Sequence, residues 1–410
     1  MAQIKPFKAI RPAKDKVAFV ASRSYQEYPK KELNAELAFN PFSFLHIINP
    51  GYKFHKKVSG SERFQLVHNR YLEFLEEGIL LKDTDANLYL YQIEKGNFRC
   101  CGLFCATSVG DYRADVIKKH ENTLEQREKL FADYLDTVAF NAEPVLMTYQ
   151  DNEAISKELD RQKKRTPEYF FTTKDRMTHR LWVISEKETV AKLTQEFEKV
   201  SSLYIADGHH RSASSNLLAA ISEKRNPPTG KEAYNFFMSY LIPESEIRIY
   251  EFNRMVKDLN GLSKERFLIA LDKLYRIENQ GSILYKPTKK HHFGMYLDGQ
   301  FYSLYLRKKV YNFTDPLSKL DTQILFKTIL QPILGIKDLR TDKRIQYGYG
   351  KHNVIQMKDE IDKGSFSVGF SLVPITMEEI KDIADAGLVM PPKSTYIEPK
   401  LRSGITIYEL

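Results

Sequence analysis

Cysteine is scarce in this chain of 410 residues, which contains only three. Cys100, Cys101 and Cys105 stand together in a segment, 99–107, that has the composition of a buried strand. Their spacing fits neither a disulfide framework nor the usual ligand sets for metals. We therefore expect all three to pack as small buried hydrophobes.

Long apolar runs are also missing, so the sequence offers no candidate membrane span. Residues 1–6 lack the basic flank and apolar stretch of a signal peptide. We expect a cytoplasmic protein without a membrane partner. Internal repeats and low-complexity tracts are absent, and no Gly-x-x-x-x-Gly-Lys-Ser/Thr run occurs, which argues against a P-loop kinase.

Net charge is modest and its distribution is diffuse. The 62 Lys and Arg exceed the 53 Asp and Glu, giving a formal charge of +9 that suits an anionic partner. The basic clusters at 161–165 and 286–292 are short and adjoin turn-forming residues. They favour solvated loops over a nucleic-acid surface, so we expect a small-molecule partner, and the chain is compatible with a homodimer.

The length exceeds what one compact core usually holds, which predicts two domains. Alternating segments at 88–93 and 366–372 predict strands, and Asp298-Gly299 predicts a hairpin between 293–297 and 301–306. Strands and helices do not alternate regularly, so the expected class is α+β, or mixed α/β.

Helix signals are equally visible. Residues 61–77 carry apolar side chains at helical spacing and stop before Gly78. Thr123 and Thr376 each begin a capping-box pattern, followed by predicted helices that run to about residue 140 and to Gly387.

A domain boundary is expected near 257–262, where Asn260-Gly261 precedes a helix capped by Ser263. The predicted domains are 1–257, which carries the catalytic residues, and 258–410, which contributes a loop to the site.

One polar segment has the composition of an anion site. It stands between a predicted strand, 202–205, and a predicted helix, 212–224, and consists of Asp207, Gly208, His209, His210 and Arg211. First-turn N–H groups and the helix dipole favour anions at such a junction, and glycine permits close backbone approach.

The side chains of this segment suit phosphate chemistry. Arg211 supplies a planar cationic fork, and His209 and His210 supply donors that titrate near neutral pH. Asp207 could hold Mg²⁺, orient a histidine or accept a proton from a hydroxyl. The alternative is that Asp207 only caps the helix and the basic residues decorate its surface. Two histidines and an arginine exceed what capping requires, whereas adjacent histidines do not favour a zinc site.

Further polar clusters are candidate partners of this segment. His120 and Glu121 precede a helix and could supply a second acid/base or metal position, although Thr123 alone accounts for the cap. Arg254 ends a strand-like run and could contact an anion. Two prolines precede a triplet rich in hydrogen-bond donors, which consists of Lys393, Ser394 and Thr395. The triplet could clamp phosphate, or it could form an ordinary polar loop.

Taken with other segments, this motif resembles the bacterial and archaeal family called domain of unknown function 1015. The resemblance extends over nearly the whole chain and rests on residues 6–7 with 10–12, 40–46, 111–112 with 120–123, 179–182, 205–211 and 390–400. One departure is the N-terminal loop, where 17–28 replaces the family's usual Pro-Tyr-Asp, so no role of that aspartate is transferred.

The Asp-Gly-His-His-Arg string alone is similar to the motif of free L-serine kinases with a ParB/sulfiredoxin-like fold. That resemblance implies a ParB/sulfiredoxin-like core with a second α+β domain, and a site that handles nucleotide phosphates. The expected function is phosphoryl transfer from ATP or ADP, with Mg²⁺ held by Asp207 and Glu121, to a small hydroxyl metabolite such as free serine. Gly208, Arg254 and residues 393–395 would bind the nucleotide. Phosphomonoester hydrolysis, for example of phosphoserine, and non-enzymatic binding of nucleotide or nucleic acid remain alternatives.

Overall fold

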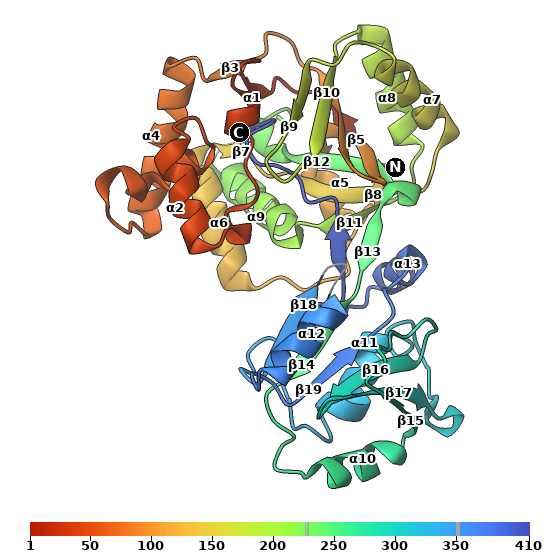
Figure 1. Ribbon diagram of the computed structural model, residues 1–410. Coiled ribbons are helices and arrows are strands. Elements are labelled where there is room, and N and C mark those ends of the chain that lie inside the picture. The colour runs from red at the N-terminus through yellow and green to blue at the C-terminus, as the bar shows by residue number, and fades with distance from the viewer. Residues whose placement is uncertain (226, 228, 350–352) are drawn as a thin grey trace. The chain divides into compact units, whose positions relative to one another are not determined.

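The computed structural model describes residues 1–225, 227, 229–349 and 353–410. Within it the chain forms two compact units (Figure 1). The first unit comprises Met1–Lys118, Asn122–Ile247 and Pro399–Leu410, and the second comprises Lys119–Glu121 and Arg248–Glu398. Apart from Lys119–Glu121, the second unit thus begins at Arg248, whereas the sequence predicts a boundary near 257–262. The last residues of the chain belong to the first unit.

A 9-stranded sheet forms the centre of the first unit. Its order is β6-β11-β8-β12-β5-β4-β10-β9, with β1 paired to β5. β11 runs parallel to β6 and antiparallel to β8, so the sheet is mixed. The strands are β1 (Ile4–Lys5), β4 (Leu88–Lys95), β5 (Phe98–Ser108), β6 (Ile117–Lys118), β8 (Val145–Tyr149), β9 (Tyr169–Thr172), β10 (Thr178–Ile184), β11 (Leu203–Asp207) and β12 (Phe236–Pro243).

Helices α7 (Glu153–Lys163) and α8 (Lys187–Glu198) pack together and bury apolar side chains against this sheet (Figure 1). Ile155 and Leu159 on α7 and Leu193 and Phe197 on α8 join a core with strand residues such as Met147. Apolar residues recur at helical spacing on both helices, which explains why each buries one side.

A second core of the first unit lies around α4 (Gly60–Glu76), whose Phe64, Val67, Tyr71 and Phe74 are buried. The remaining helices are α1 (Val17–Val20), α2 (Lys30–Phe39), α3 (Leu45–Ile48), α5 (Val109–Arg113), α6 (Glu125–Val138) and α9 (His209–Arg225). Short turns are η1 (Tyr25–Glu27), η2 (Pro50–Phe54), η3 (Ala233–Asn235) and η4 (Glu244–Glu246). Two small sheets pair β2 (Ile10–Pro12) with β3 (Leu80–Lys82), and β7 (Phe140–Asn141) with β21 (Tyr408–Glu409).

The second unit has its own six-stranded antiparallel sheet, in the order β15-β17-β16-β19-β14-β18. Its strands are β14 (Phe252–Val256), β15 (Tyr275–Gly281), β16 (His292–Leu297), β17 (Gln300–Leu306), β18 (Ile345–Tyr349) and β19 (Val368–Ser371). A separate pair joins β13 (Arg248–Tyr250) to β20 (Tyr396–Glu398).

The helices of the second unit are α10 (Lys264–Asp272), α11 (Asp321–Leu325), α12 (Asn353–Asp362) and α13 (Met377–Asp385), with the turn η5 (Lys308–Val310). α11 continues directly into η6 (Phe326–Leu330), a π-helical turn. Ile324, Leu325, Ile329 and Leu330 from this continuous helix pack into the core of the unit.

Several sequence predictions are confirmed. The class is α+β with a mixed sheet, the helix predicted at 61–77 is α4, and Asp298-Gly299 turns the hairpin of β16 and β17. Thr376 caps α13 with a complete capping box. The three cysteines are buried and unbonded to one another.

The capping box predicted at Thr123 is wrong. α6 begins at Glu125, and the Thr123 hydroxyl bonds to the side chain of Glu128 instead of a first-turn N–H group. Leu124 occupies the N-cap position, so Thr123 lies one residue before it and its hydroxyl is not placed to accept from a first-turn N–H group. The ParB/sulfiredoxin-like assignment of the core stays a prediction.

In the described part of the chain, no helix combines the length and the apolar character that a bilayer crossing requires.

Candidate functional site

The junction of β11 and α9 forms the polar centre that the sequence predicts. β11 ends at Asp207 and α9 begins at His209, with only Gly208 between them. Gly208 has a φ of +106°, a conformation that side chains with a Cβ rarely adopt. The strand and the helix can therefore meet across a single residue because that residue is glycine.

The helix begins earlier than the sequence suggested. Residues 209–211 were expected in the connection, but they form the first turn of α9. A helical bond runs from the Ser212 N–H to the Gly208 carbonyl oxygen at 3.0 Å, so residues 209–211 form the turn whose N–H groups lie at the N-terminal end of the helix. Such a turn attracts anions through its N–H groups and the helix dipole.

Asp207 holds two cations at this junction. Lys400 Nζ donates to Asp207 Oδ1 at 3.0 Å, and Arg211 Nη2 donates to Asp207 Oδ2. Burial opposes ionisation, but the charges of Arg211 and Lys400 outweigh it and lower the pKa of Asp207 to about 2. The carboxylate is therefore ionised at neutral pH and is a poor proton acceptor.

Arg211 is fixed from a second direction. Its Nη1 donates to the Pro144 carbonyl oxygen at 2.7 Å and lies 3.7 Å from Glu143 Oε2. The Ser403 hydroxyl in turn donates to Glu143 Oε1 at 3.1 Å. The guanidinium is thus held in one orientation, which suits it to bidentate contact with phosphate oxygens.

Glu27, at the end of η1, is the carboxylate of this region best suited to accept a proton. Desolvation by the surrounding protein raises its pKa, and the charges of Lys400, Arg23 and Arg402 only partly oppose this. Glu27 remains accessible to solvent. A carboxylate whose pKa moves toward neutrality matches the requirement for a general base better than Asp207 does.

Arg402 connects this region to a buried network. Its side chain is 6% exposed, and its Nη2 donates to Asp175 Oδ2 at 2.5 Å and to Thr173 Oγ1 at 3.3 Å. His179, fully buried, places Nε2 3.2 Å from Thr173 Oγ1 and Nδ1 2.7 Å from the Tyr91 hydroxyl oxygen. Burial and the charge of Arg402 lower the pKa of His179 to about 3, so this histidine is neutral.

The two histidines of the motif differ in exposure. His209 is 5% exposed, and its charge when protonated contributes to the lowered pKa of Asp207. His210 is partly exposed on the first turn of α9. Solvent therefore reaches the ring of His210 more readily than the ring of His209.

The other predicted site residues belong to the second unit. His120 is 1% exposed and burial lowers its pKa to about 4, while Glu121 is exposed. The backbone N–H of Met390 donates to the His120 carbonyl oxygen at 3.0 Å. His120 is therefore a neutral residue attached to the segment that leads to Lys393.

Arg254 is 1% exposed and supports that same segment. Its Nη1 donates to the Phe252 carbonyl oxygen at 2.5 Å and its Nη2 to the Lys393 carbonyl oxygen at 3.1 Å. Burial lowers its pKa to about 10, so it remains a cation at neutral pH. These bonds favour a structural role, and cofactor binding by Arg254 stays a prediction.

The three residues of the predicted phosphate clamp differ in exposure. Ser394 is 4% exposed, and its hydroxyl donates to the Pro391 carbonyl oxygen at 2.6 Å and meets Thr322 Oγ1 at 3.1 Å. Lys393 is exposed, with its Nζ 5.4 Å from the Phe252 ring centroid, and Thr395 is partly buried. Of the three, Lys393 retains the most accessible polar group.

The family described as "Protein of unknown function (DUF1015)" matches residues 4–323. The chain belongs to this family. No curated protein matches this DUF1015 chain significantly.

Solved structures with detectable similarity to this DUF1015 chain are distant. A free serine kinase in complex with AMP is 14% identical, with a TM-score of 0.34 over 74% of this chain and 91% of that one. SbnI from Staphylococcus aureus, truncated at its C-terminus, is 11% identical, with a TM-score of 0.39 over 74% and 85%. A conserved hypothetical protein from Pyrococcus furiosus is 13% identical, with a TM-score of 0.32 over 74% and 94%. At these TM-scores none of the similarities assigns a function.

The site of this DUF1015 protein includes residues that sequence reasoning missed. Lys400, Arg402, Glu143 and Glu27 are far from the 207–211 motif in sequence. The available signal in the sequence was weak: Lys400 ends the stretch 390–400 that carries the family resemblance, and Arg402 follows two residues later.

The two predicted magnesium ligands differ in their surroundings. Both oxygens of Asp207 contact cations, and Glu121 is an exposed residue of the second unit. Among the described residues, no cluster of three His, Cys, Asp or Glu side chains could hold a metal. Magnesium binding by Asp207 and Glu121 stays a prediction.

Proposed function

We propose that this protein transfers a phosphoryl group from ATP or ADP to the hydroxyl of a small metabolite, with free L-serine as the first acceptor to test. The observation that supports this most is the arrangement of Lys400 and Arg211 on the two oxygens of Asp207, beside the first turn of α9. Phosphoryl transfer depends mainly on positioned cations and N–H donors.

In the proposed reaction, the acceptor oxygen forms a bond to the terminal phosphorus while the bond from that phosphorus to the bridging oxygen breaks. Arg211, Lys400 and the first-turn N–H groups stabilise the charge on the phosphate oxygens. Glu27 takes the hydroxyl proton, and the nucleotide leaves with the electron pair of the broken bond. Asp207 keeps the two cations in position.

In this proposal, the buried network around Arg402 supports the site. Asp175 and Thr173 orient Arg402, whose charge influences Glu27. Neutral His179 supports Thr173 without adding a second positive charge. The cytoplasmic setting and the homodimer expected from the sequence stay proposals alongside this function.

Calorimetric titration with ATP, ADP and AMP tests whether the junction binds phosphate. Arg211→Ala should weaken nucleotide binding at least about tenfold, as expected for loss of a charge-assisted contact. Arg225→Ala is a matched control, because Arg225 lies at the other end of α9 and pairs with Asp136. Equal losses in both variants would contradict a phosphate site at the β11–α9 junction.

Turnover assays separate the reaction types. Phosphoserine formed from serine and nucleotide supports the transferase, whereas phosphate released from phosphoserine alone indicates the hydrolase. Binding of polynucleotide that falls steeply with salt, without turnover, indicates the non-enzymatic alternative.

A further inference from the structure

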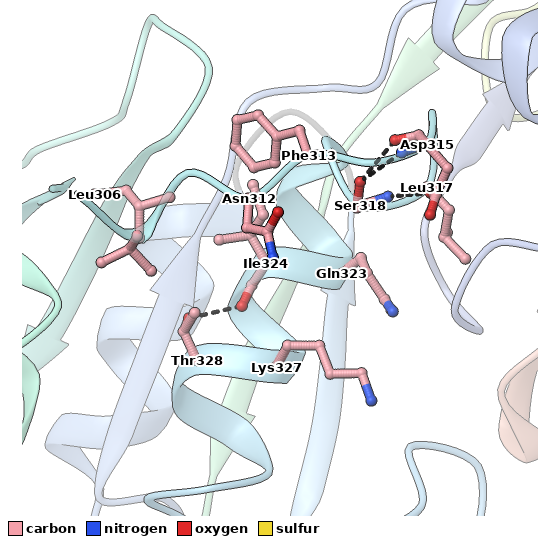
Figure 2. Close-up of a pocket in the computed structure, with 11 residues that line it drawn as sticks. Leu306, Asn312, Phe313, Asp315, Leu317, Ser318, Gln323, Ile324, Lys327 and Thr328 are labelled. Carbon is pink, nitrogen blue, oxygen red and sulfur yellow. Dashed lines mark hydrogen bonds between the residues drawn. The ribbon is translucent and has the colours of Figure 1, made fainter. Parts of the chain in front are cut away.

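The second unit contains a pocket of about 280 Å³ that the proposed reaction does not use (Figure 2). It lies between the end of β17, the segment that follows η5, and the continuous helix of α11 and η6. Its lining residues are Leu306, Val310, Asn312, Phe313, Asp315, Leu317, Ser318, Gln323, Ile324, Lys327 and Thr328. All of them belong to one compact unit.

The lining of the pocket combines apolar and polar side chains. In the view of Figure 2, Leu306 and Thr328 lie on one side, Asp315 and Lys327 on the other, and Phe313 and Ile324 between them. Asp315 and Lys327 supply one carboxylate and one ammonium group to the lining, and Leu306, Phe313 and Ile324 offer contacts for a hydrocarbon group.

Asp315 is rigidly placed. Its Oδ1 accepts from the Ser318 N–H at 2.8 Å, and the Ser318 hydroxyl donates to the Asp315 carbonyl oxygen at 2.7 Å. The Ser318 hydroxyl oxygen also accepts from the N–H groups of Asp315 and Thr314 at 3.1 and 3.0 Å. Asp315 Oδ2 accepts from the Thr314 hydroxyl at 3.2 Å. The carboxylate is thus held by neutral donors of its own turn.

Lys327 lies on η6, and π-helical turns within α-helices occur frequently at functional sites. Its Nζ is 3.5 Å from Gln331 Oε1 and 5.5 Å from the Phe326 ring centroid. Among the described residues, no carboxylate lies within ion-pair distance of this ammonium. The side chain is exposed and can therefore turn toward an anionic group in the pocket.

We infer that this pocket binds a free α-amino acid with an apolar side chain. The ligand's ammonium group would meet Asp315, its carboxylate would meet Lys327, and its side chain would contact Leu306, Phe313 and Ile324. The volume is slightly below the range of about 300–1,000 Å³ typical of sites for drug-sized ligands, which suits an amino acid better than a nucleotide. The pocket is therefore a second, independent ligand site.

Calorimetric titration of the full chain with L-leucine and with L-phenylalanine tests this inference. We expect saturable binding of at least one of them. 4-Methylpentanoate, which lacks the ammonium group, and 3-methylbutylamine, which lacks the carboxylate, should each bind at least about tenfold more weakly than leucine. Absence of saturable heat with both amino acids would overturn the inference.

Variants assign the binding to this pocket. Lys327→Met should weaken binding about tenfold or more, whereas Lys319→Met, a change at a nearby exposed lysine outside the lining, should not. Asp315→Asn should act like Lys327→Met if its turn still folds. Arg211→Ala should leave amino-acid binding unchanged, because it alters the first unit. Equal binding by the Lys327 and Lys319 variants, or loss in Arg211→Ala, would overturn the assignment.

Discussion

Lys400 Nζ lies 3.0 Å from Asp207 Oδ1, although 193 positions separate the two residues in sequence. If this lysine contributes to phosphate binding, Lys400→Met should weaken the binding of ATP or ADP about tenfold or more. Lys199→Met is the control, because Lys199 is an exposed lysine paired with Glu196 in the same unit. Titration calorimetry of both variants gives the comparison, and unchanged affinity in Lys400→Met would remove Lys400 from the site.

Gly208→Ala should impair both stability and nucleotide binding. The φ of +106° is strained for alanine, and a Cβ at this position would lie 2.9 Å from Arg211 Nε. Strain of this kind costs about 1–3 kcal/mol, measurable by denaturant unfolding.

Gly364→Ala separates the two effects. Gly364 has a φ of +78°, and a Cβ there would meet nothing within 4 Å. Both variants should lose stability, but only Gly208→Ala should displace Arg211 and weaken nucleotide binding. A Gly208→Ala protein that binds nucleotide normally would show that the arginine position is unimportant.

Glu27→Gln should reduce turnover by about 10²–10⁴-fold, the usual contribution of a general base, with little change in nucleotide affinity. The reaction requires ionised Glu27, and desolvation raises its pKa. The wild-type rate should therefore fall as pH drops through that raised pKa, and the variant should lack this acid limb. A pH profile with the same acid limb in both proteins would assign the proton transfer to another group.

His179 should make the protein sensitive to mild acid. Its pKa is about 3 in the folded protein against an ordinary 6.5, so the unfolded chain binds the proton first as pH falls. Stability is fully present above about pH 6.5 and declines toward pH 3, by roughly 3 kcal/mol at pH 4.

Urea unfolding between pH 7 and pH 4 measures this effect. His179→Gln should show a flatter dependence than wild type, whereas His55→Gln, at an exposed position, should retain the wild-type slope. Identical slopes for wild type and His179→Gln would mean that another group causes the acid sensitivity.

Local signals in the sequence predicted the core of the site well. The sequence predicted the buried strand before Asp207 and the apolar side of the following helix, and it predicted the junction between them at Gly208. The helix start was placed three residues late, because the polarity of the two histidines and the arginine favoured a loop.

Long-range partners could not be predicted in the same way. Lys400 reaches Asp207 because the chain leaves the second unit at Pro399 and returns to the first, and no local periodicity encodes that return. Thr123 failed as a cap because the helix begins one residue later than the pattern predicts, with Leu124 at the N-cap position. The backbone contacts of Arg254 to Phe252 and Lys393 were likewise not predictable from the strand-like run that it ends.

Phosphorus NMR of the protein incubated with L-serine and ATP or ADP, with and without Mg²⁺, tests the central claim most directly. We expect a phosphoserine resonance that grows as nucleotide is consumed. Arg211→Ala should slow the growth of this resonance at least about 100-fold, whereas Arg225→Ala should leave its rate unchanged. No phosphoserine from any combination, or equal rates in the two arginine variants, would contradict phosphoryl transfer to serine at this site.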